Sequence, residues 1–322
     1  MVSQAKRMAC CALFALALAG GAAQGRDSLT VARDQWVGYA GFFVAQSQGY
    51  FAAAGLDIKV VEFSVPGETL PPLIAGHVDI ALTTLYNLAV VTARGERSLE
   101  AVYLLDTSNG ADAVVARPDI ATPADLKGKT VAVTVGEVNE LLLLKALESA
   151  HLAQDAVHLV NLGADDAGAA LLAGRVDAAV TWEPWVSRAS AAGAHVIFSS
   201  ADVPNLILDA VAVTRSTLQA RRAAIVRFLQ ALDRGIAYLR AHPVEARAIV
   251  AKALDTTPED AARMLDRDRL YGLDDNRALL APDGQGPRSL ATVARFLALR
   301  DPAHATGDVA GLLSAQLLPA PR

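Results

Sequence analysis

Two ten-residue segments decide the fold of this chain: residues 74–83 read IAGHVDIALT, and residues 172–181, which follow 98 positions later, read LAGRVDAAVT. In each segment an apolar stretch ends at a Gly, the residue that most easily takes the left-handed conformation after the last turn of a helix. An Asp then opens a short apolar run with the composition of a buried strand. The same helix–turn–strand unit therefore occurs twice, and this repeat predicts two lobes of similar construction.

The sequence around each segment alternates strands and helices. In the first half we expect strands at 29–32, 56–63, 78–82 and 102–105, and helices at 39–50, 68–75 and 84–94. In the second half we expect strands at 130–134, 157–162, 177–181 and 195–198, and helices at 139–150, 166–173 and from Pro184 onward. This order predicts an α/β protein in which each lobe is a mainly parallel sheet flanked by helices.

The last third of the chain has a different pattern. After a strand at 206–214, the sequence predicts only helices, at 220–240, 244–254, 258–268 and 288–299. A region without strands cannot form a third sheet, so we expect it to pack back on the first lobe. The predicted domains are lobe I at 26–117 and 205–322 and lobe II at 118–204. Two crossovers, near 112–118 and 203–210, would join the lobes on one side of a cleft.

The first 25 residues predict an export signal. Lys6 and Arg7 precede an apolar run of 12 residues, Met8–Ala19, and small residues follow it. The run is shorter than the roughly 20 apolar residues that cross a bilayer. Both cysteines, Cys10 and Cys11, lie in this segment, so the processed chain has no thiol for a disulfide, a zinc site or a nucleophile. We expect a soluble periplasmic protein without a lipid anchor.

Composition and motifs exclude several classes of protein. The 322 residues are 53% hydrophobic and 20% charged, which is typical of a globular chain, and the net charge of −5 without a basic block argues against nucleic-acid binding. Residues 128–130 (GKT) precede a strand, whereas a phosphate-binding loop must follow one. The six histidines form no HExxH pair, and residues 106–110 lack the pattern of a nucleophile elbow. We therefore expect neither an enzyme nor a cofactor or metal site.

The candidate binding residues follow the predicted strands, because ligands of open α/β sheets bind beyond strand ends. Trp36 and Trp182 belong to different lobes and would form a stacking clamp across the cleft. Hydrogen-bonding residues of the first lobe and its hinge are Tyr39, Thr83, Thr84, Ser108 and Asn109. Residues that would fix the far side of the ligand are Glu137, the backbone N–H of Val138, Glu183 and Asp209. Thr84 also suits a plain helix N-cap.

Three segments carry a resemblance to a known family: Trp36–Phe51 (WVGYAGFFVAQSQGYF), Asp125–Val133 (DLKGKTVAV) and Asp177–Trp185 (DAAVTWEPW). They resemble the periplasmic substrate-binding proteins of the nitrate/sulfonate/taurine ABC-transporter family, which is similar in fold to thiamine-pyrimidine-precursor binding proteins. The resemblance covers nearly all of 27–240. It implies a monomeric, two-lobed type II periplasmic binding protein that closes on its solute by a hinge. It also implies an inner-membrane permease with its ATPase as partner.

The resemblance leaves the ligand open. Family members for nitrate or sulfonates usually bring Lys, Arg or His to the cleft, whereas the strand-end loops here carry acidic residues: Asp34, Asp106, Asp112, Glu137, Glu183 and, in the returning crossover, Asp209. Carboxylates and tryptophans favour a cationic or amine-bearing ligand, such as an aminopyrimidine or the zwitterion taurine. A sulfonate or nitrate held by helix N-termini near Gly38 and Val138 is the other possibility.

A different class of function also remains. A related group of proteins with this fold makes the thiamine pyrimidine, so a biosynthetic enzyme of that type is the alternative to a receptor. The predicted export signal argues against such an enzyme, because its substrate pools lie in the cytoplasm.

Overall fold

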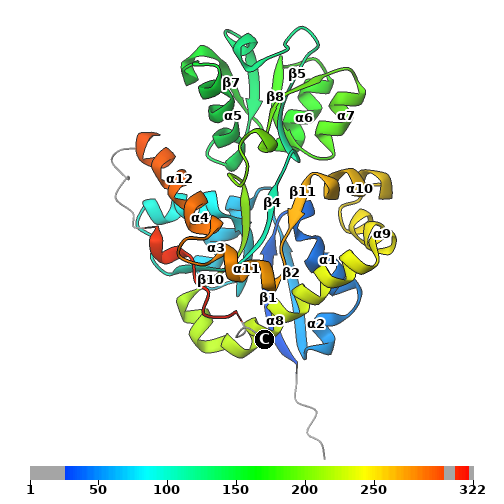
Figure 1. Cartoon of the computed structure of the whole chain (residues 1–322), viewed down its shortest axis with the longest axis vertical. Helices are drawn as coiled ribbons and strands as arrows, with labels where there is room; N and C mark the ends of the chain where they lie inside the picture. The colour runs from blue at the N-terminus through cyan, green and yellow to red at the C-terminus, as the bar shows by residue number, and fades with distance from the viewer. Residues whose placement is uncertain (1–25, 301–308, 319–322) are drawn as a thin grey trace, which may run out of the picture.

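The computed structural model describes residues 26–300 and 309–318, so the predicted export signal at 1–25 lies outside the described residues. Two β-sheets form the centres of two halves, which lie one above the other in Figure 1. Six-stranded sheet A has the order β11-β4-β10-β3-β1-β2, and five-stranded sheet B has the order β7-β6-β8-β5-β9. No helix in the described ranges is long and apolar enough to cross a membrane.

Nine of the eleven described strands overlap the segments expected from the sequence, and β5 and β11 do not. Sheet A contains β1 (Asp27–Arg33), β2 (Leu56–Glu62), β3 (Ile80–Thr84), β4 (Leu99–Ser108), β10 (Leu208–Thr214) and β11 (Asp268–Leu270). Sheet B contains β5 (Asp112–Ala116), β6 (Thr130–Val133), β7 (His158–Asn161), β8 (Ala178–Trp182) and β9 (His195–Ser199). The two-lobed α/β class predicted from the alternating pattern is therefore confirmed.

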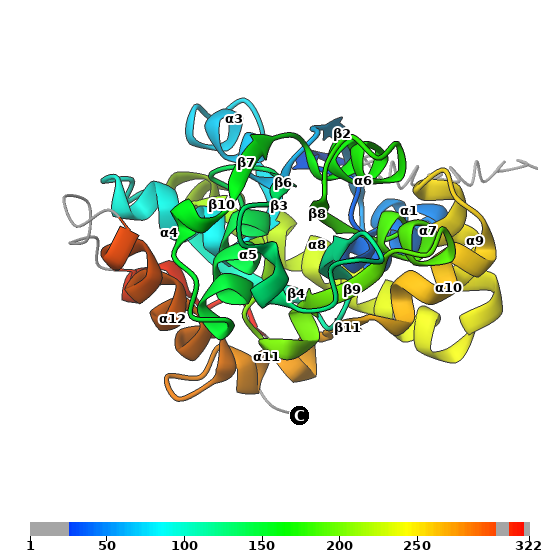
Figure 2. The same cartoon turned by 90° about the horizontal axis from the view of Figure 1, so that it is seen from above.

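Helices cover both sheets. Those before the second crossover are α1 (Ala40–Ser47), α2 (Tyr50–Ala53), α3 (Leu70–Ile74), α4 (Leu85–Ala93), α5 (Val138–Ser149), α6 (Ala164–Leu172) and α7 (Trp185–Ala191). Those after it are α8 (Arg215–Ala241), α9 (Pro243–Ala253), α10 (Pro258–Asp266), α11 (Leu273–Leu279) and α12 (Gln285–Arg300). Figure 2 shows α5 on one side of the sheet B strands and α6 and α7 on the other. Alternate residues of β5 follow this division, since Val114 packs in the α5 cluster and Val115 in the α6–α7 cluster.

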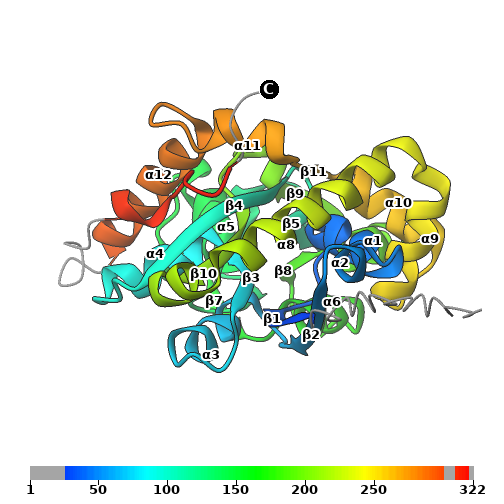
Figure 3. The same ribbon diagram turned by 90° about the horizontal axis from the view of Figure 1, so that it is seen from below.

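The long helix α8 crosses the sheet A half beside α1 and α2 (Figure 3). Phe51 stacks on Phe228 at 5.1 Å between ring centroids. A Cβ added to Gly235 would lie 2.0 Å from the carbonyl oxygen of Gly41, so only glycine permits this close approach of α8 to α1. The C-terminal region therefore packs against the sheet A half.

Each sheet is mixed, which corrects the expectation of mainly parallel sheets. Four strand pairings are parallel and five are antiparallel. Strands β5 and β10 run antiparallel to both of their neighbours. The reason is topological, because each of these strands receives the chain from the other half and therefore starts at the junction between the sheets, where β1, β4 and β8 end.

The first crossover is shorter than predicted. Residues 112–116 were expected in a connection but form β5 in sheet B, so only residues 109–111 join β4 to β5. The second connection, residues 200–207, overlaps the predicted one at 203–210. The lobe ranges 26–117 with 205–322 and 118–204 stay a prediction.

The C-terminal region contains one strand that the sequence analysis missed. Residues 268–270 form β11, which pairs antiparallel with β4 at the edge of sheet A. The expected helix over 258–268 ends instead at Asp266. A three-residue strand is too short to show an alternating pattern, so periodicity had no means of revealing it.

The repeated segment has the same geometry in both sheets. Gly76 and Gly174 both have positive φ, at 74° and 66°, directly before β3 and β8. In sheet A the carboxylate of Asp79 accepts a hydrogen bond from the backbone N–H of Thr30 at 2.8 Å. In sheet B Asp177 accepts one from Thr130, also at 2.8 Å. Each Asp thus fastens its strand to a parallel neighbour, β1 in one sheet and β6 in the other.

Each of these two aspartates also forms an ion pair with an arginine. Arg221 pairs with Asp79 at 3.0 Å, and Arg117 pairs with Asp177 at 2.9 Å.

We expect Asp79→Ala to lower the free energy of unfolding by about 1–2 kcal/mol, because it leaves a partly buried backbone N–H without its acceptor. Urea unfolding followed by circular dichroism measures this loss. Asp57→Ala, at an exposed position of β2, is the control, and equal stability of the two variants would contradict the assigned role.

Candidate functional site

The two predicted clamp residues meet where the sheets face each other. Trp36 follows β1 of sheet A, and Trp182 ends β8 of sheet B. Their ring centroids lie 6.2 Å apart with the planes tilted by 52°, and the residues are only 5% and 7% exposed. The rings contact each other directly, so a flat ligand that enters between them must first part the two halves.

Sheet B supplies a second indole beside this pair. The ring nitrogens of Trp182 and Trp185 both donate hydrogen bonds to Oδ1 of Asp165, at 2.8 and 2.9 Å. The whole sequence contains three tryptophans, so all of them lie at this junction.

Buried carboxyl groups surround the base of the clamp. Five aspartates at strand ends that face the junction are each at most 9% exposed: Asp34, Asp106, Asp112, Asp209 and Asp268. Strand pairing brings them close, since Asp209 lies opposite Asp106 in the β10–β4 pair and Asp112 lies opposite Trp182. The first four are among the acidic residues that the sequence placed after strand ends or in the crossover. Asp268 was not among them.

Burial controls the protonation of this acidic cluster. It raises the pKa of Asp34 and of Asp112 to about 7. Burial, together with repulsion from neighbouring carboxylates, raises the pKa values of Asp106, Asp209 and Asp268 well above the usual range. In the described part of the chain no ion pair joins any of the five to a basic side chain. That part of the chain therefore offers no paired basic side chain to compensate the negative charge that these carboxyl groups carry when they ionise.

Several polar atoms of the cluster have no hydrogen-bond partner of normal geometry. They include both carboxyl oxygens of Asp106 and Asp268, the indole nitrogen of Trp36 and the hydroxyl of Tyr39. The indole of Trp36 still lies close enough to Asp106 to lower the pKa of that carboxyl. Gly38 makes room for both, since a Cβ there would lie 1.8 Å from Asp106 Oδ2 and 2.5 Å from Trp36 Nε1.

The predicted hydrogen-bonding residues of sheet A have varied surroundings. The hydroxyl of Thr83 donates to the carbonyl of Pro66 at 3.0 Å. Thr84 caps α4 by accepting a hydrogen bond from the backbone N–H of Asn87, as the alternative reading of that residue predicted. Tyr39 is fully buried, and its hydroxyl lies near Asp34.

The residues of the crossovers bond to one another. Ser108 and Ser200 join the two connections through their hydroxyl groups at 2.8 Å. Asn109 is exposed, and its backbone N–H donates to the carbonyl of Arg267 at 2.9 Å. Ser108 therefore lies where the two connections meet, whereas Asn109 is exposed, and their roles as hinge and ligand-binding residues stay a prediction.

Two predicted ligand contacts of sheet B instead bridge the halves. Glu137 accepts a hydrogen bond from Asn87 Nδ2 at 2.5 Å, and Glu183 pairs with Arg267 at 2.7 Å. Val138 starts α5 next to Glu137 and is buried. Asn87 and Arg267 were not predicted as site residues, because such long-range pairings leave no local pattern in the sequence.

A pocket of about 220 Å³ opens beside the clamp. Residues from both halves line it, including Gln35, Asp165, Trp182, Glu183 and Met264. Trp182 lines this pocket, whereas none of the five buried aspartates does.

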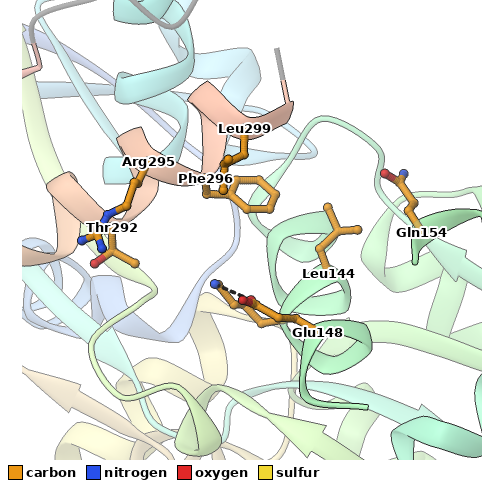
Figure 4. A pocket seen from close by; sticks show the side chains of 8 residues that line it. Leu144, Glu148, Gln154, Thr292, Arg295, Phe296 and Leu299 are labelled. Carbon is orange, nitrogen blue, oxygen red and sulfur yellow. Dashed lines mark hydrogen bonds and ion pairs between the residues drawn. The ribbon is translucent and has the colours of Figure 1, made fainter. Parts of the chain in front are cut away.

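A larger pocket, of about 490 Å³, lies elsewhere, between α5 and α12 (Figure 4). Its wall carries Leu144 and the Lys145–Glu148 ion pair of α5, at 2.6 Å, and Phe296 and Arg295 of α12. It contains none of the predicted site residues and no buried charge, so size alone does not make it the functional site.

Comparison with known proteins agrees with this architecture. The periplasmic aliphatic sulphonate binding protein SsuA from Escherichia coli superposes with a TM-score of 0.69 at 24% identity, over 85% of this chain and 93% of that one. This likeness shows the fold.

Two relatives have informative names. A putative thiamine biosynthesis protein of Haemophilus influenzae is 29% identical over 233 residues, which cover 69% of this chain and 72% of that protein. The formylaminopyrimidine-binding protein of Halalkalibacterium halodurans is 29% identical over 138 residues, 43% of this chain and 42% of that protein. The family model described as NMT1/THI5 like matches residues 36–246, nearly two thirds of the sequence, and this chain therefore belongs to the NMT1/THI5-like family.

Proposed function

We propose that this protein is a solute-binding receptor that captures a small amine-bearing ligand, of the aminopyrimidine or cationic-amine type, between its two halves. The observation that carries the proposal is the cluster of five buried carboxyl groups, without a basic partner, behind two tryptophans from opposite sheets. Buried charge is costly unless it is paired, and the ligand supplies the pairing.

The chemistry of the cluster selects the ligand. Carboxyl oxygens of Asp106 and Asp268 accept hydrogen bonds, and a ligand rich in N–H groups donates them. Indole faces attract cations and stack on flat rings, so Trp36 and Trp182 would hold the other surface of an aromatic amine. A sulfonate or nitrate would meet repulsion from the same carboxylates.

Capture requires the halves to separate and close. Opening about the two connections, residues 109–111 and 200–207, would part Trp36 from Trp182 and admit the ligand. Closure would restore the Asn87–Glu137 and Arg267–Glu183 contacts across the junction. In this proposal the lobes are the halves built on sheet A and sheet B. Glu137 and Glu183 then stabilise the closed form, and the roles of Thr83, Thr84, Asn109 and Val138 in holding the ligand stay a prediction.

The proposed setting is the periplasm, after removal of residues 1–25. There the receptor would deliver its ligand, as a monomer, to an inner-membrane permease driven by an ATPase. The names of the formylaminopyrimidine-binding and aliphatic sulphonate binding relatives support a transport role.

A second candidate is an enzyme of thiamine-pyrimidine biosynthesis, which the name of the Haemophilus influenzae relative favours. Recovery of bound ligand distinguishes the two. A receptor returns the ligand unchanged after denaturation, whereas an enzyme converts it.

Thermal unfolding against a panel of ligands tests the proposed ligand class. We expect aminopyrimidines or small amines to raise the melting temperature, by a few degrees at a hundred times the dissociation constant, which corresponds to about 2.7 kcal/mol. Tryptophan fluorescence should change with the same compounds, because every tryptophan lies at the junction. Taurine, alkanesulfonates, nitrate and bicarbonate complete the panel. Stabilisation by sulfonates or nitrate alone would refute the acidic clamp.

The pH dependence of binding follows from the raised pKa values. A cation favours ionised carboxylates, so its binding releases a proton from a group whose pKa is about 7 in the free protein, such as Asp34. For an amine that stays protonated throughout, the dissociation constant should be about ten-fold larger at pH 6 than at pH 8 for one released proton. Calorimetry in buffers of different ionisation enthalpy measures both quantities. Tighter binding at pH 6 would contradict the proposed charge complementarity.

The stability of the free protein should have its own pH dependence. The pKa of Asp112 is about 7 in the folded chain and about 3.9 in an unfolded one. Its burial therefore costs nothing below pH 4 and destabilises the fold progressively as the pH rises toward 7. We expect Asp112→Asn, relative to the unchanged protein, to gain roughly 4 kcal/mol between pH 4 and pH 8. Asp57→Asn, an exposed control, should show no such gain. A difference independent of pH would show that Asp112 does not titrate this way.

A further inference from the structure

The C-terminal region brings one short strand to the binding site. Strand β11 extends sheet A beside β4 (Figure 1), with Asp268 opposite Ser108. The backbone N–H of Asn109, in the first crossover, donates to the carbonyl of Arg267 at 2.9 Å. This segment lies beyond residue 246, where the match to the family model ends. Part of the candidate site therefore comes from residues outside the match to the family model.

The two arginines that flank Asp268 in the sequence both interact with other groups. Arg267 reaches across the junction to Glu183, at 2.7 Å, and the guanidinium of Arg269 lies over the ring of Tyr271, 5.6 Å from its centre. Asp268, between these two arginines, pairs with neither. Asp268 is 9% exposed, and both of its carboxyl oxygens are buried without a hydrogen-bond partner of normal geometry.

The side chains around Asp268 give it no compensating positive charge, although the backbone N–H of Arg269 acts to lower the pKa of its carboxyl. The nearest charged groups that act on it are Asp209 and Asp112, and it acts in turn on Asp106. Asp268 thus lies among other carboxyl groups, while the two arginines beside it bond elsewhere. A positively charged or N–H-rich group would supply the partner that its carboxyl lacks.

We propose that Asp268 contacts the ligand and sets the preference of this protein for positively charged or N–H-donating ligands. This inference rests on the proposed receptor function and extends it to a residue outside the family match. The neighbouring Arg267 links the same segment to Glu183 of the other half. The segment from α10 to β11 thus couples recognition of ligand charge to closure.

The test compares Asp268→Asn with the unchanged protein against an amine and a sulfonate. Asn preserves the size of the side chain but removes the negative charge. The control is Asp266→Asn, which makes the same change at an exposed position two residues earlier. The probes are an aminopyrimidine and methylamine on one side and taurine and ethanesulfonate on the other, with dissociation constants from calorimetry at pH 8.

We expect Asp268→Asn to weaken amine or aminopyrimidine binding by roughly ten-fold or more, the usual effect of losing a charged hydrogen bond. Any sulfonate that binds should instead bind more tightly, because the Asn amide cannot ionise and its N–H groups can donate to an anion. Asp266→Asn should change neither. Circular dichroism and a melting temperature at pH 8 no lower than that of the unchanged protein would confirm that the variant folds.

The outcomes separate this inference from the proposed function. If the unchanged protein binds sulfonates but no amine, the proposed ligand class is wrong, and a gain in sulfonate affinity on Asp268→Asn would still support contact with the ligand. If either ligand class binds and Asp268→Asn alters its affinity no more than Asp266→Asn does, then Asp268 is not a ligand contact.

Discussion

Five aspartates packed together without a cation form the constraint on which the rest of this structure depends. The cluster exists because strands of both sheets begin or end at one junction, and each contributes an acidic residue there: Asp34, Asp106, Asp112, Asp209 and Asp268. Repulsion and desolvation keep these groups protonated more readily than usual. The neutral form makes the buried cluster tolerable to the fold, and a cationic ligand of the proposed class would turn the same groups into a strong binding site.

The contacts across the junction have a different role from the cluster. Asn87–Glu137 and Arg267–Glu183 lie between the halves. In the proposed receptor these bonds would form on closure, so they would contribute equally to every bound ligand. In the same proposal the carboxyl groups of the acidic cluster would distinguish one ligand from another. Affinity and selectivity are thus assigned to separate sets of side chains.

The sequence predicted much of the fold and part of the site, for reasons that particular residues make clear. The repeated Gly–Asp turn identified two comparable sheets, because Asp79 and Asp177 fasten parallel strands in the same way. The strand-end rule correctly brought Trp36 and Trp182 together. Neither the repeat nor the strand-end rule could identify Asp268. Its strand has only three residues, and Asp268 lies at the amino end, whereas the rule considers residues at the carboxyl end.

The division of the chain between the sheets has a consequence for how the molecule forms. Sheet B uses one continuous stretch, residues 112–199, whereas sheet A must pair Thr107 with Leu208 across that entire stretch. Closing so long a loop is entropically expensive in an extended chain and far cheaper once the intervening residues are compact. The sheet B half therefore acts as a scaffold on the folding route: it shortens the search by which the last strands reach sheet A.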